Sequence, residues 1–237
     1  MAEGLERAGG PGGLAVALIA LALLGGLILV ASVFHFRRSR EKPDEERAAV
    51  RRYFVAFFVL LLALPCGLAI LASPRPRETL EAIGWTFGRA GLGLTITLAG
   101  LPLAVLAGFV GSRDEGLRKF YPLAKAAFTD ARAFAGYELS YVLLYYLPWE
   151  SVFRGVLFLP LIPAIGLGPA LAVQVTASTL LHLGHPRSEV LAAVLGGLAF
   201  GLIAYFTRSF LYTLALHAAT GISTDTFLFL GRRRAGE

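Results

Sequence analysis

Residues 90–111 read AGLGLTITLAGLPLAVLAGFVG, a run without one formal charge. Residues 13–34 and 53–73 form two further runs of the same character. A helix needs roughly 20 apolar residues to cross the ~30 Å hydrocarbon layer of a bilayer, whereas helices in soluble cores are usually shorter and amphipathic. The three runs therefore predict transmembrane helices.

Four more apolar stretches follow, at residues 133–164, 169–184, 190–206 and 209–230. Pro160 and Pro163 are expected to end the first of them, because proline removes a backbone donor and clashes with the preceding turn. The predicted fold is an all-α polytopic transmembrane helix bundle of about seven spans, or about eight if Pro148 breaks the fourth span.

Basic residues gather in alternate loops. Residues 35–52 hold seven Arg or Lys, residues 112–132 hold five, and the loop 163–169 holds none. The positive-inside rule predicts a multi-pass protein of the cell membrane with both basic loops and the C-terminus in the cytoplasm and the N-terminus outside. The loop 74–89, with three arginines, fits this orientation least well. Residues 112–132 are expected to form a helix on the membrane surface or a polar loop.

The chain divides by composition into N-terminal spans and basic loops (1–132), a polar-containing core (133–230) and a basic tail (231–237). Its net charge is +6, but the basic residues stand at the ends of apolar runs and form no stripe with aromatic residues. Membrane lipid is therefore an expected partner and nucleic acid is not. The sequence carries no signal for an oligomeric state.

Glu150 and Arg154 lie inside a predicted span, where a charge costs at least ~2.5–3.5 kcal/mol and usually faces the bundle interior or a cavity. They occur in the segment Trp149-Glu-Ser-Val-Phe-Arg-Gly155, and a spacing of four places them on one helix face within pairing distance. Tyr146 and Phe158 extend that face. The pair is either part of a chemical site or an ion pair that only holds helices together.

Histidines mark two other spans. One polar stripe consists of Gln174, Ser178, His182 and His185. It is either part of a site or simply exposed to water at the membrane interface. In the last span one face carries Thr213, His217, Thr220, Gly221 and Thr224, and Asp225 follows just off that face. His217 is a site candidate or a hydrogen-bonding core residue, whereas we expect Glu138 to lie at the interface.

One carboxylate and two or three imidazoles on separate helices suit a hydrolytic reaction. A carboxylate and a histidine can together deprotonate water, and a further histidine can stabilise the oxyanion of acyl transfer. The same donors also suit zinc, but the sequence lacks the His-Glu-x-x-His pair of zinc proteases. No cofactor is therefore expected, with zinc as the less favoured alternative.

At these residues the sequence resembles the CAAX-protease and bacteriocin-processing family of intramembrane glutamic peptidases, over roughly residues 135–230. That family carries Glu-Glu-x-x-x-Arg-Gly, Phe-x-x-x-His and His-x-x-x-Asn. The corresponding segments here are, in the same order, Trp149 to Gly155, Ser178 to His182, and His217 to Gly221. Trp149 thus stands in place of the usual catalytic glutamate, and Gly221 in place of an asparagine that helps to hold the oxyanion.

The resemblance implies an intramembrane peptidase in which Glu150 takes over as the base and activates water with His182. Arg154 would orient Glu150, and His217, with His185, would stabilise the oxyanion. The segment Leu-His-x-Gly-x-Pro-x-x-Glu (181–189) adds Glu189 to the site. A shift of one position turns a side chain by about 100°, so this takeover requires a local rotation, for which Pro148 is a candidate cause.

The expected substrate is a peptide bond close to the membrane, in a lipidated or membrane-anchored protein. Two alternatives remain open. Trp149 and Gly221 favour a catalytically inactive relative that acts as a membrane scaffold or partner protein. The buried charges would also suit a transporter or ion-binding bundle, although no repeat relates the two halves of the chain.

Overall fold

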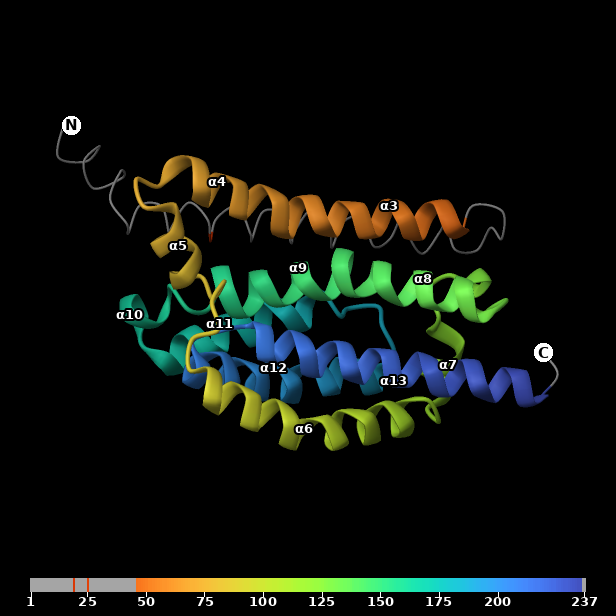
Figure 1. The fold of residues 1–237 in the computed structure, drawn as a ribbon. Coiled ribbons are helices and arrows are strands. Elements are labelled where there is room, and N and C mark those ends of the chain that lie inside the picture. Colours follow the sequence, from red (N-terminus) through yellow and green to blue (C-terminus); the bar gives the residue numbers. More distant parts are fainter. Residues whose placement is uncertain (1–18, 20–24, 26–45, 236–237) are drawn as a thin grey trace.

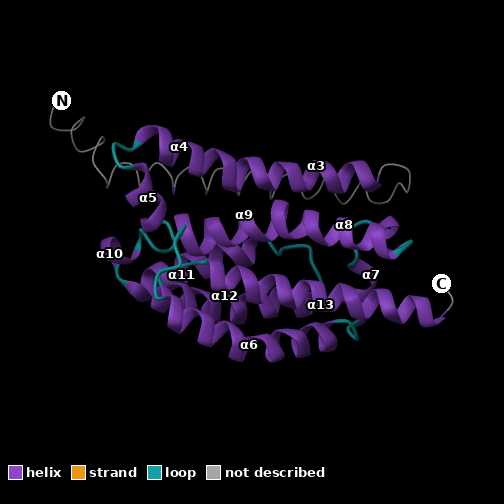
Figure 2. Cartoon of the chain, viewed as in Figure 1, coloured by secondary structure: helices purple, strands orange, loops and turns teal. Residues whose placement is uncertain are grey.

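The computed structural model describes residues 46–235, together with Ile19 and Gly25. The predicted first span (13–34) and most of the first basic loop thus lie outside the described residues. Every regular element within 46–235 is a helix (Figure 2). Three stretches, Glu46–Ala72, Ala90–Gly111 and Arg187–Thr207, are long and apolar enough to cross a membrane. The predicted fold class, a helical membrane bundle, is confirmed.

Two long helices contain wider π-helical turns directly before a proline. The first comprises α3 (Glu46–Phe58), η2 (Val59–Ala63) and α4 (Leu64–Ala72), with Pro65 in the first turn of α4. The second comprises α8 (Ala131–Tyr141), η4 (Val142–Tyr146), α9 (Leu147–Glu150) and η5 (Ser151–Val156), with Pro148 in the first turn of α9. A proline ring clashes with the carbonyl one turn earlier, and a π turn widens the backbone at that point.

The helix of residues 131–156 is continuous through Pro148, so the alternative of an eighth span created by a break there is wrong. Its first turn is capped by Asp130, whose side chain accepts hydrogen bonds from the backbone N–H groups of Arg132 and Ala133. It ends at Val156, shortly before the two prolines that were expected to end it. A turn and the short α10 (Ile162–Ile165) follow.

The other long helices are α6 (Ala90–Gly111), α11 (Leu167–Leu180), α12 (Arg187–Thr207) and α13 (Leu211–Ala235). The helix of α3 and α4 packs on one side of residues 131–156, and α13 packs on the other side (Figure 1). Helix α6 lies along α13, and α11 lies along α12. Because α11 ends before the predicted boundary, His182 and His185 lie in the turn that follows it.

The loop of residues 112–132 is neither a continuous surface helix nor a plain polar loop. It contains α7 (Glu115–Phe120) and the 3₁₀-helix η3 (Lys125–Phe128), and it folds against one end of the bundle. The Leu123 side chain is only 2% exposed. The Leu123 backbone N–H donates to the Tyr137 hydroxyl (3.1 Å), and that of Lys125 donates to Glu46 Oε2 (2.8 Å).

The opposite end of the bundle carries the loop 74–89, whose three arginines fitted the predicted orientation least well. Residues Pro76–Ala82 form α5. Within this loop Arg75 pairs with Glu78 (3.4 Å) and Arg77 pairs with Glu81 (3.0 Å). Two of the three positive charges are therefore balanced by carboxylates on adjacent turns of the same short segment.

Candidate active site

The centre of the candidate site is the Glu150 carboxylate, which is 0% exposed. Its Oε1 atom lies 2.7 Å from His217 Nδ1, and its Oε2 atom accepts a hydrogen bond from Thr213 Oγ1, also at 2.7 Å. Thr213 and His217 are one turn apart on α13 and therefore share a face, as the sequence predicted. The carboxylate thus joins the helix of residues 131–156 to α13.

Arg154 lies one turn after Glu150, and its Nε atom is 3.3 Å from Glu150 Oε2. The guanidinium is almost completely enclosed, with its side chain 3% exposed, and it also lies over the Phe200 ring at 5.5 Å from the centroid. The predicted pair is therefore present. Because both charges are buried, each one depends on the other for compensation.

His217 is the accessible member of its pair, since 23% of its side chain is exposed. A carboxylate accepts hydrogen bonds, so Nδ1 of His217 carries the hydrogen in the bond to Glu150. In the neutral ring the second nitrogen, Nε2, then has a free lone pair. This arrangement orients an imidazole so that Nε2 can accept a proton.

His182 adopts the same tautomer through a different partner. Its Nδ1 lies 2.8 Å from the Ser178 carbonyl oxygen, which can only accept, so Nδ1 donates and Nε2 is free. Its ring meets Trp149 edge to face, with the centroids 4.8 Å apart, and Trp149 lies 6.4 Å from the His217 ring. The contacts of His182 are thus with Ser178 and Trp149, and Glu150 is hydrogen-bonded to His217.

A second imidazole–carboxylate pair lies nearer the end of the bundle. His185 Nδ1 is 3.0 Å from Glu189 Oε1, and the Tyr121 hydroxyl donates to the same oxygen at 2.7 Å. Burial raises the pKa of Tyr121 well above its ordinary value, and the nearby Glu189 charge adds to this, so the phenol keeps the proton that it donates. The rings of His185 and His182 are 5.4 Å apart.

Trp149 is 1% exposed and belongs to the aromatic core rather than to the carboxylate cluster. Its indole stacks on Phe57 of α3 at 5.9 Å and on Tyr145 at 5.6 Å. The helix is therefore turned so that Glu150, and not position 149, faces α13. An indole has no acceptor nitrogen and cannot serve as a base.

Two further carboxylates are buried. Glu138, which was expected at the membrane interface, is 6% exposed, and Asp225 is 2% exposed. Glu138 lies on α8 and Asp225 on α13, and neither Glu138 carboxylate oxygen has a hydrogen-bond partner among the described residues.

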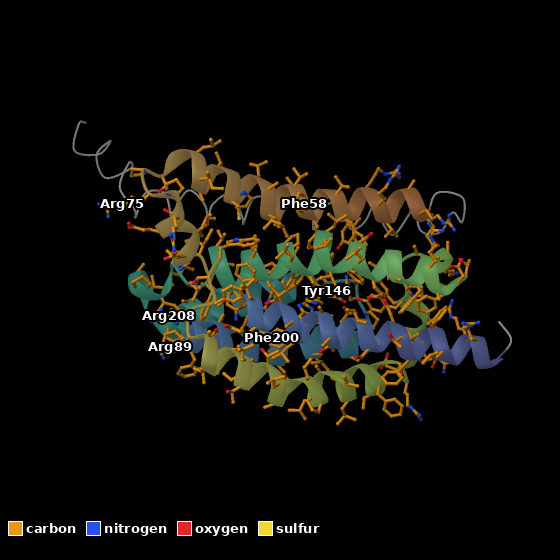
Figure 3. The ribbon with its side chains drawn as sticks, in the orientation of Figure 1. Phe58, Arg75, Arg89, Tyr146, Phe200 and Arg208 are labelled. Atoms are coloured by element: carbon orange, nitrogen blue, oxygen red, sulfur yellow. The ribbon has the colours of Figure 1, made fainter. Side chains whose placement is uncertain are left out.

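Tyr146 also belongs to the site, on the face where its spacing from Glu150 had placed it. It lies between the helix of residues 131–156 and α13 (Figure 3), with its ring centroid 4.7 Å from that of His217. A methyl group added at Gly221 would collide with the Tyr146 hydroxyl. The hydroxyl therefore occupies the space beside α13 that a larger residue at position 221 would need.

Within residues 46–235, Ile19 and Gly25, no group of three or more His, Cys, Asp or Glu side chains has an arrangement that would hold a metal ion.

Residues 134–222 match the family model described as "Type II CAAX prenyl endopeptidase Rce1-like". This segment includes Tyr146, Glu150, Arg154, His182 and His217. No curated protein and no solved structure matches the chain.

Proposed function

We propose that this membrane protein is an intramembrane peptidase of the Rce1-like type, because residues 134–222 match the family model of type II CAAX prenyl endopeptidases. The observation that carries the proposal is the hydrogen bond between Glu150 Oε1 and His217 Nδ1. It presents an imidazole with a free Nε2 from inside a helical bundle. The arrangement suits the deprotonation of water.

The geometry supports a division of roles that differs from the expected one. Glu150 is 0% exposed and its two oxygens are engaged by His217 and Thr213, so it is better placed to orient a base than to contact water. His217 takes the water proton on Nε2, and the carboxylate stabilises the imidazolium that forms. Arg154 holds Glu150 ionised from the opposite side.

The reaction proceeds by addition and elimination. The water oxygen forms a bond to the carbonyl carbon while His217 Nε2 takes one water proton, and the carbonyl π electrons move onto oxygen. When the carbonyl re-forms, the C–N bond breaks and its electron pair stays on nitrogen. His217 returns its proton to that nitrogen, so the products are a carboxyl group and an amine.

His182 has the role of positioning the water rather than pairing with Glu150. Its neutral ring offers Nε2 as an acceptor for the second water hydrogen, while the Ser178 carbonyl fixes its orientation. His185 supports this histidine from the turn between α11 and α12. Glu189, in the first turn of α12, contacts His185 and also Tyr121 of the loop 112–132. Glu189 is thus a positioning residue.

We place the protein in the cell membrane with the basic loop 112–132 and the C-terminal tail in the cytoplasm, as the positive-inside rule indicates. The turn that carries His182 lies at the same end of the bundle as that loop. The substrate then approaches from the cytoplasmic side. A peptide with a prenylated C-terminal cysteine motif, the class named in the family description, is the first candidate, and other membrane-anchored peptides are the second.

The test uses purified full-length protein in lipid nanodiscs with two fluorogenic probes, a prenylated CAAX peptide and an unprenylated transmembrane peptide. Glu150→Gln and His217→Ala should each lower kcat by about 10³-fold or more, because the base loses its orientation or is removed. Thr95→Val, on the outer face of α6, is the control and should keep full activity. Unchanged cleavage in both site variants would refute the mechanism.

A second candidate function, a catalytically inactive scaffold or partner protein, is favoured by Trp149 and Gly221, which replace two chemical groups of the family motifs. It predicts no hydrolysis of either probe by the unmodified protein. It also predicts that Glu150→Gln changes only stability or the binding of another membrane protein.

A further inference from the structure

The proposed hydrolysis requires a hydrogen-bond donor for the carbonyl oxygen as it becomes negatively charged. Neither neutral imidazole supplies one. His217 and His182 both use their Nδ1 hydrogens for other partners, Glu150 and the Ser178 carbonyl, which leaves their Nε2 atoms as acceptors. The donor must therefore come from another side chain beside His217.

Arg154 is badly placed for this role. Its Nε contacts Glu150 Oε2, the same oxygen that Thr213 contacts, whereas His217 contacts the other oxygen of the carboxylate. Thr213 precedes His217 on α13, and Arg154 follows Glu150 on its own helix. Since these two helices run in opposite directions (Figure 1), both residues lie on the far side of Glu150 from the turn that carries His182.

Tyr146 lies on the opposite side, toward that turn. It precedes Glu150 by one helical turn, it is 5% exposed, and its ring is tilted by 51° to that of His217 with the centroids 4.7 Å apart. Its hydroxyl reaches past His217 to Gly221, the next turn of α13. A phenol is a good donor, and this one adjoins His217, the histidine whose Nε2 takes the proton of the attacking water.

Gly221 and Tyr146 are matched in shape. A Cβ atom at position 221 would meet both the hydroxyl oxygen and the Cζ atom of Tyr146 at distances that no real contact has, so the hydroxyl can occupy this place only because residue 221 is glycine. The space beside α13 at position 221 is thus filled from the neighbouring helix by a hydroxyl group.

We propose that the Tyr146 hydroxyl is the oxyanion donor of this site, filling the space that Gly221 leaves open. This inference rests on the proposed peptidase function. The hydroxyl keeps its proton throughout and donates a hydrogen bond that strengthens as charge develops on the carbonyl oxygen. It therefore contributes to the transition state more than to substrate binding.

The experiment compares Tyr146→Phe with Tyr145→Phe, in nanodiscs and with the prenylated probe. The control removes a hydroxyl from the adjacent buried tyrosine, whose ring faces Tyr53 and Phe57 on the other side of the helix. Tyr146→Phe should lower kcat by about 10²- to 10³-fold with KM changed by less than about threefold, as expected for the loss of one oxyanion donor. Tyr145→Phe should change kcat by less than about threefold.

A second pair of variants tests the role of the space itself. In a Tyr146→Ala background, Gly221→Asn supplies an amide donor and Gly221→Ala supplies none. The asparagine variant should recover at least about tenfold in kcat over the alanine variant, which corresponds to one partly aligned hydrogen bond.

The outcomes separate this inference from the function on which it rests. If Glu150→Gln and His217→Ala abolish cleavage but Tyr146→Phe keeps full kcat, the peptidase mechanism stands and the assignment of Tyr146 is overturned. A loss confined to KM, or a loss without rescue by Gly221→Asn, overturns the assignment too. If the unmodified protein cleaves neither probe, the proposed function fails first and this inference fails with it.

Discussion

Glu150 and His217 come from helices that are far apart in the sequence, yet their side chains are joined by a 2.7 Å hydrogen bond. The carboxylate is fully enclosed, whereas 23% of the imidazole side chain is exposed. Burial on one side and partial exposure on the other give the pair a direction, from a fixed charge to an accessible imidazole ring. The same organisation orients the base in hydrolases of unrelated folds.

Variants of Thr213 test whether the orientation of Glu150 depends on the hydrogen bond to its second carboxylate oxygen. Its hydroxyl lies 2.7 Å from both Glu150 Oε2 and the Phe210 carbonyl, so one hydrogen is shared between two acceptors. Thr213→Val should lower kcat by about tenfold, the equivalent of one modest hydrogen bond of about 1.4 kcal/mol, and Thr213→Ser should restore it. Thr220→Val removes a hydroxyl that bonds only within α13 and should have no effect.

The buried ion pair predicts a non-additive double-mutant cycle. Arg154→Met leaves the Glu150 charge without its cation and should lower the free energy of unfolding by about 3–5 kcal/mol. Adding Glu150→Gln removes the uncompensated charge, so the double variant should be more stable than Arg154→Met alone. Equilibrium unfolding in mixed micelles measures the cycle, and an additive result would contradict the direct pairing of the two groups.

The helices themselves were largely predictable, because an uncharged run that is long enough to cross a bilayer has few alternatives to a transmembrane helix. Residues 90–111 form a helix with the predicted bounds. The spacing of Glu150 and Arg154 also identified their pairing correctly. Spacing along one helix does not give the rotation of that helix against another. The structure joins Glu150 to His217, whereas the sequence had grouped Glu150 with His182 for the activation of water.

The π-helical turns explain part of this difference. They lie on both sides of Leu147–Glu150, and each one changes the direction of every later side chain relative to a regular α-helix. Pro148 was a signal for a local irregularity, but its type was not predictable. Glu138 and Asp225 are also buried, and the spacing of residues along one helix does not show which groups of the neighbouring helices cover them.

The contacts of Glu189 are expected to stabilise the loop 112–132. Its Oε1 atom accepts from both Tyr121 and His185, so Glu189→Ala removes two contacts, whereas Glu189→Gln keeps an acceptor. Glu189→Ala should raise amide hydrogen exchange in residues 121–128 by about tenfold or more, and Glu189→Gln should raise it less. Glu115→Ala, which removes an exposed ion pair with Lys119 from the same loop, serves as the control and should leave exchange unchanged.

Asp130 predicts an acid-sensitive start for α8. Hydrogen bonds from the backbone N–H groups of Ala133 and Arg132 hold the pKa of the Asp130 carboxyl below its usual value. Its stabilising effect is therefore complete above about pH 4, the ordinary aspartate range, and is lost as the pH falls through the folded-state pKa. Asp130→Asn keeps a capping oxygen that does not titrate. Thermal unfolding from pH 6 to 3 should show the unmodified protein losing stability relative to this variant; parallel curves would contradict the cap.

The close packing around Gly108 predicts that the interface between α6 and α13 does not tolerate a larger residue at this position. A Cβ atom there would lie 2.5 Å from Ser223 Cβ and 2.8 Å from both the Thr220 carbonyl oxygen and the Thr224 backbone nitrogen, so the two backbones would have to separate. Gly108→Ala should lower the free energy of unfolding by about 1–3 kcal/mol, the usual result of overpacking, even though alanine is the better helix former. Gly91→Ala lies on the same helix with nothing within 4 Å and should be neutral or slightly stabilising. Because α13 carries Thr213 and His217, the separation caused by Gly108→Ala should also reduce kcat, and equal stability of the two alanine variants would mean that these helices do not approach as closely as described.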